Sequence, residues 1–183
     1  MREKLEIPPG DFVIISTGSC IDIKNHADII KAMSLIIKEF PCTYLHLGSG
    51  HLEEQEKKQA EDQHISEAIR FVGNKKNVRD YLIAADVYVM TSKFEGLSIA
   101  SIEAMACGLP SVLYNSPGLV DLIKNDDNGF LIERNPESIA DKIIAYKHNP
   151  GLMTEKGNNA RRFVTANFSM PSSVEKISAL YKK

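Results

Sequence analysis

The hydrophobic and polar positions along this chain follow two alternating patterns. Short runs of β-branched and aliphatic residues are typical of buried strands, and longer segments with apolar residues about every third or fourth position are typical of amphipathic helices. The clearest strand is FVIIST at 12–17, and the clearest helical stripe covers 25–40. Further strands are expected at 43–48, 69–72, 87–90, 111–114 and 129–132. Further helices are expected at 52–64, 78–85, 98–106, 118–123, 136–148, 152–166 and 171–181.

This alternation predicts an α/β fold. Strands that are separated by helices form a parallel sheet with right-handed crossovers, here of about six strands with helices on both faces. A chain of 183 residues fits a single domain. The first ten residues are polar and turn at Pro8-Pro9-Gly10, so we expect a linker or tail over 1–10 and the domain over 11–183.

Composition and charge exclude several classes of function. A net charge of −2 provides no basic field for nucleic acid. No apolar run reaches the length of a membrane helix and no secretory signal opens the sequence, so a cytoplasmic location is expected. The cysteines Cys20, Cys42 and Cys107 lack CxxC spacing, which favours reduced thiols in a reducing compartment.

The most informative stretch for chemistry is TSKFEGLSIASIEAMACGLP at 91–110, directly after the strand at 87–90. It places Glu95 beside Gly96 where a strand ends and a helix begins, and it carries Glu103 on that helix. In open α/β sheets, polar ligands bind at such strand ends, and a helix N-terminus there favours phosphate. The stretch therefore indicates a site for a phosphorylated ligand.

Each residue of this stretch has a physical reason to be considered. Gly96 lets a ligand approach the backbone closely, and Ser98 is placed to cap the helix. The amides from Gly96 through Leu97 to Ser98, together with the helix dipole, suit a diphosphate. Taken one at a time, Glu95 and Glu103 also match an ordinary exposed loop glutamate and an ordinary exposed helix glutamate.

As a whole, the stretch resembles the donor-site motif of the group 1 retaining glycosyltransferases of the GT-B type. These enzymes have two facing Rossmann-like domains, and the similarity is to the C-terminal, nucleotide-sugar-binding domain. It covers nearly the whole chain and is most specific in the block around Glu95. The pieces that carry the resemblance are EGLSIASIEAMACGLPSV, AADVYVMTS, FVGNKKNV and NGFLI, with FVIISTGSCIDIKNH matching in outline.

The resemblance implies roles for particular residues. Lys24, six positions after Gly18, would contact the nucleotide diphosphate. Glu95 would orient the donor sugar, Glu103 would bind the ribose, and backbone groups near Val72 would face the base. On this basis Glu95 and Lys24 are the candidate catalytic residues. The substrate-binding candidates are Gly18, Val72, Gly96, Leu97, Ser98 and Glu103.

One position departs from the family pattern. Ser19 stands where the family usually has an arginine after the glycine. A serine hydroxyl can hydrogen-bond a phosphate but cannot neutralise it, so the bidentate charge contact is lost and donor affinity or rate is in question. No cofactor is implied. No metal is implied either, because the histidines lack ligand spacing and Asp126-Asp127 is better interpreted as a turn.

The leading hypothesis is the donor-binding half of a hexosyl-type glycosyltransferase. It would bind a UDP- or GDP-linked sugar for transfer with retention, for example in polysaccharide biosynthesis. The acceptor would be bound by an N-terminal domain that this sequence lacks, so the isolated chain is expected to be inactive. Peripheral membrane association of the full enzyme stays open. The alternatives are a non-catalytic module on the same fold that binds a nucleotide or a protein partner, and an unrelated doubly wound domain.

Overall fold

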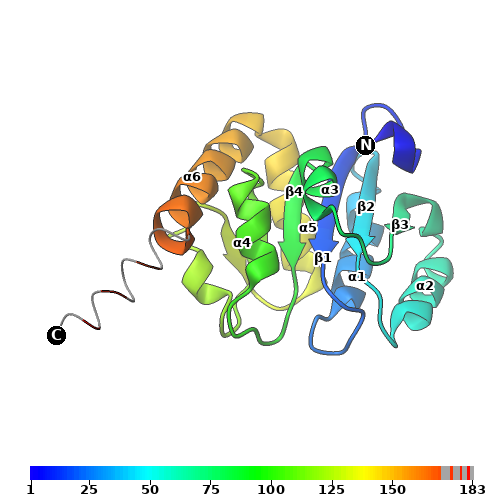
Figure 1. The fold of residues 1–183 in the computed structure, drawn as a ribbon. Coiled ribbons are helices and arrows are strands. Elements are labelled where there is room, and N and C mark those ends of the chain that lie inside the picture. The colour runs from blue at the N-terminus through cyan, green and yellow to red at the C-terminus, as the bar shows by residue number, and fades with distance from the viewer. Residues whose placement is uncertain (170–173, 175–177, 179–180, 182–183) are drawn as a thin grey trace.

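The computed structural model describes residues 1–169 together with Val174, Ser178 and Tyr181. Apart from these three positions, the helix expected at 171–181 lies outside the described residues. The rest of the chain forms one layered α/β unit in which the sheet is covered by helices on both faces (Figure 1).

A single parallel sheet organises the described fold. It has six strands in the order β3-β2-β1-β4-β5-β6, all parallel to their neighbours. The prediction of a parallel, Rossmann-like sheet of six strands is therefore confirmed. The strands are β1 (Phe12–Thr17), β2 (Cys42–Leu47), β3 (Ile69–Phe71), β4 (Val87–Met90), β5 (Ser111–Tyr114) and β6 (Phe130–Ile132).

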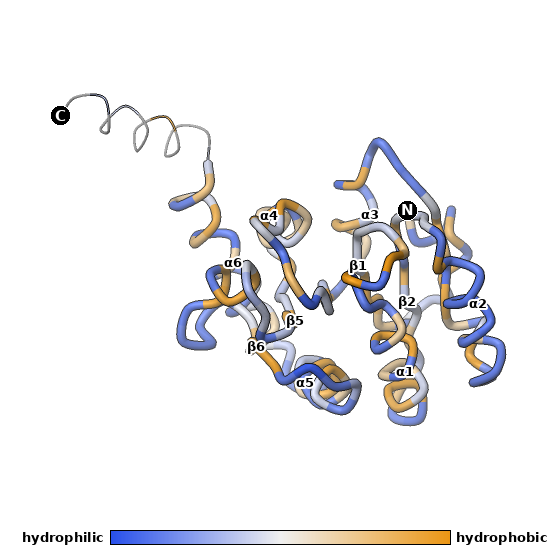
Figure 2. Tube along the Cα trace, turned by 90° about the horizontal axis from the view of Figure 1, so that it is seen from below, coloured by the Kyte–Doolittle hydropathy of each residue, from blue (hydrophilic) through white to orange (hydrophobic). Residues whose placement is uncertain are grey.

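The helices divide between the two faces of the sheet. Helix α1 packs against α2 and α5 on one face, and α4 packs against α3 and α6 on the other (Figure 2). This is the arrangement that right-handed crossovers produce when the strand order reverses direction. The helices are α1 (His26–Ile36), α2 (Glu53–Asp62), α3 (Val78–Ala84), α4 (Ile99–Ala106), α5 (Pro136–His148) and α6 (Pro150–Phe168).

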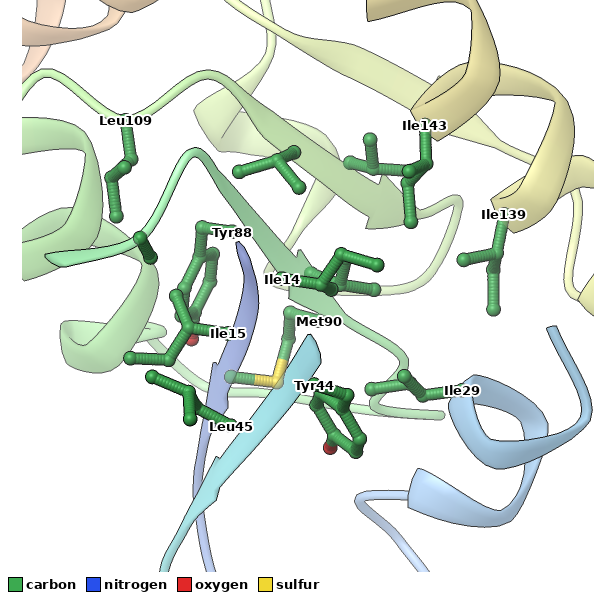
Figure 3. Packing of buried hydrophobic residues seen from close by; sticks show 14 of the residues in the cluster. Ile14, Ile15, Ile29, Tyr44, Leu45, Tyr88, Met90, Leu109, Ile139 and Ile143 are labelled. Carbon is green, nitrogen blue, oxygen red and sulfur yellow. The ribbon is translucent and has the colours of Figure 1, made fainter. Parts of the chain in front are cut away.

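The core lies on both faces of the central strands. Side chains of a strand alternate between faces, so Ile14 of β1 lies toward Ile29 of α1 and Ile139 of α5, while Ile15 lies beside Tyr88 of β4 (Figure 3). All six residues of β1 are buried. Burial on both faces explains why the sequence here is continuously apolar and not alternating.

The strand order creates a switch point between β1 and β4. From β1 the chain proceeds to β2 and β3, then crosses back to β4 on the other side of β1. In doubly wound sheets, ligands generally bind in a crevice at such a switch point, outside the carboxyl ends of the two strands. Most of the residues expected to bind the ligand belong to the loops that follow β1 and β4, whereas Val72 follows β3 and Glu103 lies on α4.

Most element boundaries agree with the sequence-based expectation to within about two residues, and two segments differ more. The helix expected over 25–40 ends at Ile36, and the helix expected over 118–123 is a 3₁₀ turn over Val120–Leu122. Boundaries of this kind are the least reliable part of a sequence-based prediction. Within the described part of the chain, no helix is both long and apolar enough to cross a membrane.

The first ten residues, expected as a linker or tail, pack against the domain. They form a 3₁₀ turn over Glu3–Leu5. The Arg2 guanidinium donates to the carbonyl of Ala84 at 2.8 Å and to the Asp86 carboxylate at 2.8 Å. Ile7 is buried in the core. The segment is therefore held against the domain by the hydrogen bonds of Arg2 and by the burial of the Ile7 side chain.

Candidate functional site

The two candidate catalytic side chains meet across the crevice. Lys24 lies in the loop after β1 and Glu95 in the loop after β4, and Lys24 Nζ donates to Glu95 Oε1 at 2.6 Å. The side chains are 20% and 13% exposed, so the pair is partly shielded from water. Ser92 Oγ donates to the same carboxylate oxygen at 2.6 Å. An ammonium group has three protons, so Lys24 can donate to a phosphate oxygen while it keeps its bond to Glu95.

Main-chain contacts hold the two loops together. Thr91 Oγ1 donates to the carbonyl of Lys24 at 2.8 Å, and the Lys93 amide donates to the carbonyl of Ile23 at 2.8 Å. The position of the Lys24–Glu95 pair is thus set by the backbone as well as by its own charge. Preorganised charges of this kind need little rearrangement when a ligand binds.

A hollow of about 260 Å³ lies at the carboxyl end of β1. It brings Gly18 and Lys24, from one loop, together with Glu103 of α4, which is 79 positions further along the chain than Lys24. Its other polar lining residues are Thr17, Ser19, Asn74 and Lys75. Three of the residues predicted from the sequence therefore line one polar cavity.

A second hollow, of about 440 Å³, adjoins the first. Glu103 and Val78 line both, so the Glu103 carboxylate lies between them. Lys76 and Arg79 line the second hollow, and Lys75 lines the first. Although the chain as a whole carries a small negative charge, this surface offers several cations to an anionic ligand.

Backbone N–H groups in the segment before α4 are available as hydrogen-bond donors. Ser98 occupies the N-cap position, but its hydroxyl pairs with Ser101 Oγ at 2.9 Å and accepts no hydrogen bond from a backbone amide. Within the described chain, no protein acceptor is found for the N–H groups of Gly96, Leu97 and Ser98. The expectation that Ser98 caps the helix through its side chain is thus wrong, since its hydroxyl pairs with Ser101 Oγ and not with a backbone amide of the first helical turn. Independently of this, the amides of Gly96, Leu97 and Ser98 are available as donors to a ligand.

The Leu97 side chain contributes differently from its amide. It is 49% exposed and points no polar group at the crevice, and Phe94 and Ile99 beside it are 55% and 56% exposed. The backbone of Leu97 therefore carries the only polar groups that this residue has for a ligand.

Val72 is less available than the sequence suggested. Its N–H donates to the His46 carbonyl at 2.8 Å, and the carbonyl of the following Gly73 accepts from the Gly48 amide at 3.2 Å. Val72 lies outside the lining of the hollow. The Val72 amide is already used in a hydrogen bond to β2, so its carbonyl is the backbone group of Val72 that remains for a nucleotide base.

Glycine at position 48 keeps the hollow's wall in place. A Cβ there would lie 1.8 Å from the Gly18 carbonyl oxygen, and the backbone φ is +145°. The loops after β1 and β2 therefore approach each other at a distance that no side chain permits. Gly50 is required for a separate reason, because a Cβ there would lie 2.4 Å from the Cys20 carbonyl oxygen.

Sequence reasoning missed three polar side chains in the lining of the hollow. Thr17, Asn74 and Lys75 line the hollow, and none was singled out from the sequence. The Thr17 side chain is held in place by a hydrogen bond, since Thr17 Oγ1 lies 3.2 Å from the hydroxyl of buried Tyr88. Burial raises the pKa of the Tyr88 hydroxyl above its ordinary value. The signal for Asn74 and Lys75 was present in FVGNKKNV, a segment similar to the family in which only the backbone near Val72 was given a role.

The chain matches known proteins over most of its length. The family model for glycosyl transferases group 1 matches residues 1–163. An uncharacterised glycosyltransferase of Haemophilus influenzae is 32% identical over 151 residues, which are 81% of this chain and 43% of that protein. A poly(ribitol-phosphate) α-N-acetylglucosaminyltransferase of Staphylococcus aureus is 30% identical over 81% of this chain and 31% of its own length. This chain thus spans less than half of either relative.

Solved structures share the fold. A point mutant of TarM from S. aureus, crystallised with fondaparinux, α-GlcNAc-glycerol and UDP, aligns with a TM-score of 0.87 at 26% identity over 96% of this chain and 37% of that one. The C-terminal domain of the group 1 glycosyl transferase LpcC from Francisella tularensis aligns with a TM-score of 0.80 at 20% identity over 90% of both chains. The protein therefore belongs to the group 1 glycosyl transferases and has the fold of the C-terminal domain of such an enzyme.

Proposed function

We propose that this domain binds the nucleotide diphosphate sugar donor of a retaining glycosyltransferase. The observation that carries the proposal is the meeting of Lys24 and Glu95 beside a polar hollow lined by Gly18 and Glu103. Ligands of doubly wound sheets bind at this switch point. Phosphate would contact Lys24 and the open amides from Gly96 to Ser98, and Glu103 would accept hydrogen bonds from the ribose.

The proposed chemistry follows from where charge develops. When the sugar leaves the nucleotide, negative charge grows on the departing diphosphate, and fixed donors there stabilise the transition state more than the ground state. Lys24 supplies a cation and the amides before α4 supply dipoles. Glu95 accepts from Lys24 through Oε1, so its other oxygen is available to orient a sugar hydroxyl.

Uridine is the nucleoside we propose to test first. The crystallised TarM mutant, 26% identical to this chain, contained UDP. A GDP-linked donor is the second choice, because backbone contacts near Val72 leave little trace of the base in the sequence. Since the chain spans less than half of its curated relatives, we further propose that the acceptor is bound by a separate domain and that this chain alone transfers little sugar.

Calorimetry with UDP, GDP and ADP tests the donor site. We expect saturable binding of one nucleotide to the 183-residue chain and an affinity about tenfold lower in Glu103→Gln, because a hydrogen bond to a charged group is worth about 1.5 kcal/mol. Glu61→Gln is the control, since Glu61 is exposed at the end of α2 and lies outside both hollows. Failure of all three nucleotides to bind at millimolar concentration would sink the proposal.

A second candidate function rests on Ser19. The family's arginine is absent at this exposed position beside the hollow, which favours a non-catalytic module that binds nucleotide weakly or a protein partner instead. Sugar transfer separates the two candidates. If the chain is joined to an acceptor-binding domain from a related enzyme and still turns over no donor although it binds nucleotide, the non-catalytic function is favoured.

A further inference from the structure

Four side chains that the donor site does not use meet beneath the loop after β1. Their ligand-type atoms, from Cys20, His26, His46 and Glu56, all lie within 4.8 Å of one another. Cys20 lies two residues after the loop glycine, His26 opens α1, His46 lies in β2 and Glu56 lies in α2. The sequence spacing predicted no metal site, because these residues are brought together only by the crossover between β1 and β2.

The cluster is buried in the protein. The exposed fractions of Cys20 and His46 are 0%, that of His26 is 1% and that of Glu56 is 3%. A thiol, two imidazoles and a carboxyl are polar groups that burial penalises unless they find partners. An arrangement of this kind therefore calls for a specific compensating interaction.

The side chains do not fully satisfy one another. Cys20 Sγ lies 3.1 Å from His46 Nε2, and His26 Nδ1 lies 3.3 Å from Glu56 Oε1. Even so, neither ring nitrogen of His26 makes a hydrogen bond with any described residue, and the same holds for Glu56 Oε2. Buried groups left in this state indicate a missing partner.

The donor set matches a tetrahedral zinc site. Zn²⁺ is bound in proteins by thiolate, imidazole and carboxylate, and bond lengths of about 2.0–2.3 Å place neighbouring ligand atoms roughly 3.3–3.8 Å apart. The two short separations in the cluster are already 3.1 Å and 3.3 Å. A thiolate, a carboxylate and two neutral imidazoles around Zn²⁺ also sum to zero net charge, which suits a buried site.

Two neighbouring hydroxyl groups, those of Ser16 and Tyr44, orient one of the proposed ligands, His46. The Nδ1 atom of His46 lies 3.3 Å from Ser16 Oγ, which in turn lies 2.5 Å from the hydroxyl of Tyr44. This leaves His46 Nε2 on the side of Cys20. Metal-bound histidines are generally oriented by such a hydrogen bond from the other ring nitrogen.

We propose that Cys20, His26, His46 and Glu56 bind a structural Zn²⁺ ion that braces the loop carrying Gly18 and Lys24. Binding converts the Cys20 thiol to a thiolate and releases its proton to solvent. With four protein ligands the site is closed, so the ion holds structure and carries no catalytic water. The proposal is independent of which nucleotide, if any, the hollow binds.

Metal analysis and cobalt substitution test the site. The chain is unfolded in guanidinium, freed of metal and refolded with one equivalent of Zn²⁺ or Co²⁺, because a buried site loads slowly once folded. We expect about one tightly held zinc per chain, a thiolate-to-cobalt charge-transfer band, and a Tm raised by at least about 5 °C over the metal-free protein. Absence of stoichiometric metal, or of the thiolate band, would overturn the proposal.

Matched variants make the result specific. Cys20→Ser should abolish the thiolate band. Cys42→Ser should keep it, since Cys42 is also a buried thiol but lies at the start of β2, outside the cluster. A band that persists unchanged in Cys20→Ser would indicate binding elsewhere and overturn the proposal. If Cys20→Ser does not fold, Glu56→Gln replaces it; retention of the thiolate band with at least about tenfold weaker binding is expected, and unchanged affinity counts against the site.

Discussion

The two loops that meet at the crevice are held in place in different ways. The loop after β1, residues 18–25, rests on buried side chains, since Cys20 within it and His26 directly after it belong to the cluster beneath it. The loop after β4, residues 91–98, is instead joined by hydrogen bonds to the loop after β5, as well as to the loop after β1. The Glu95 amide donates to the Pro117 carbonyl at 3.0 Å, and Ser116 Oγ donates to the Ser92 carbonyl at 2.7 Å.

This difference shows that each loop has a support of its own, in addition to the hydrogen bonds that join the two loops. The first loop depends on the chemistry of a few buried groups, and the second depends on a close backbone approach that requires glycine at position 118. Three substitutions test this comparison, in order of expected effect.

The largest effect is expected where the second loop rests on Gly118. Its backbone φ is +81°, and an added Cβ would lie 2.2 Å from the Glu95 carbonyl oxygen. Gly118→Ala should lower the free energy of unfolding by about 2 kcal/mol or more, because strain and a backbone clash combine. Urea unfolding followed by circular dichroism measures this change.

Gly96→Ala is the control for this prediction. A Cβ at Gly96 meets no atom within 4 Å, so stability should change by less than about 0.5 kcal/mol. Any loss of nucleotide affinity in Gly96→Ala then reports the ligand's own approach to this backbone. Equal destabilisation by the two substitutions would contradict the view that the second loop is supported at Gly118.

The next effect concerns the bridge between the loops. Lys24→Met removes the cation that pairs with Glu95 and, by our proposal, a phosphate contact. We expect nucleotide affinity to fall at least about tenfold, since charged hydrogen bonds contribute about 1.5–3 kcal/mol. Calorimetry is the measurement.

Lys93→Met supplies the matched control for the bridge. Lys93 is exposed, lies two residues before Glu95 and makes no ion pair that the described residues show. Its substitution should leave nucleotide affinity within about twofold, as expected for a screened surface charge. If both lysine variants bind equally well, Lys24 has no specific role in binding phosphate.

The smallest effect is expected for Ser19→Arg. Ser19 is exposed and lines the hollow, so the longer side chain can reach the nucleotide without entering the core. An added guanidinium should raise nucleotide affinity several-fold, because it restores a bidentate contact to phosphate. The gain should shrink at high salt, as screening of charge requires. A Ser19→Gln variant, of similar reach but neutral, separates charge from bulk.

The strands and the turn after β4 could be predicted because they depend on residues that are close together in the sequence. The runs of β-branched residues in β1 and β4 predict strands wherever they occur, and their continuous apolar character predicts burial on both faces. The Glu95–Gly96 turn directly after β4 predicts a ligand-binding site at this edge of the sheet, because polar ligands of open α/β sheets bind at strand ends. These features depend on residues close together in the chain.

Other features were not predictable because they depend on competing partners. The hydroxyl of Ser98 was expected to cap α4, but Ser101 competes for it with a hydrogen bond of 2.9 Å. Backbone groups near Val72 were expected to face the base, and the structure shows that the Val72 amide among them donates to the His46 carbonyl. Competition between two good partners is decided by geometry, which residue type alone does not specify.

The sequence by itself determined the class of fold, the switch-point edge and most of the residues proposed to bind the donor, since hydrophobic periodicity and motif spacing act over short stretches. The tertiary structure decided that Lys24 and Glu95 pair directly, and that Cys20, His26, His46 and Glu56 converge. The reason is topological. Parallel strands bring their carboxyl ends to one edge, so residues separated by a whole crossover become neighbours there.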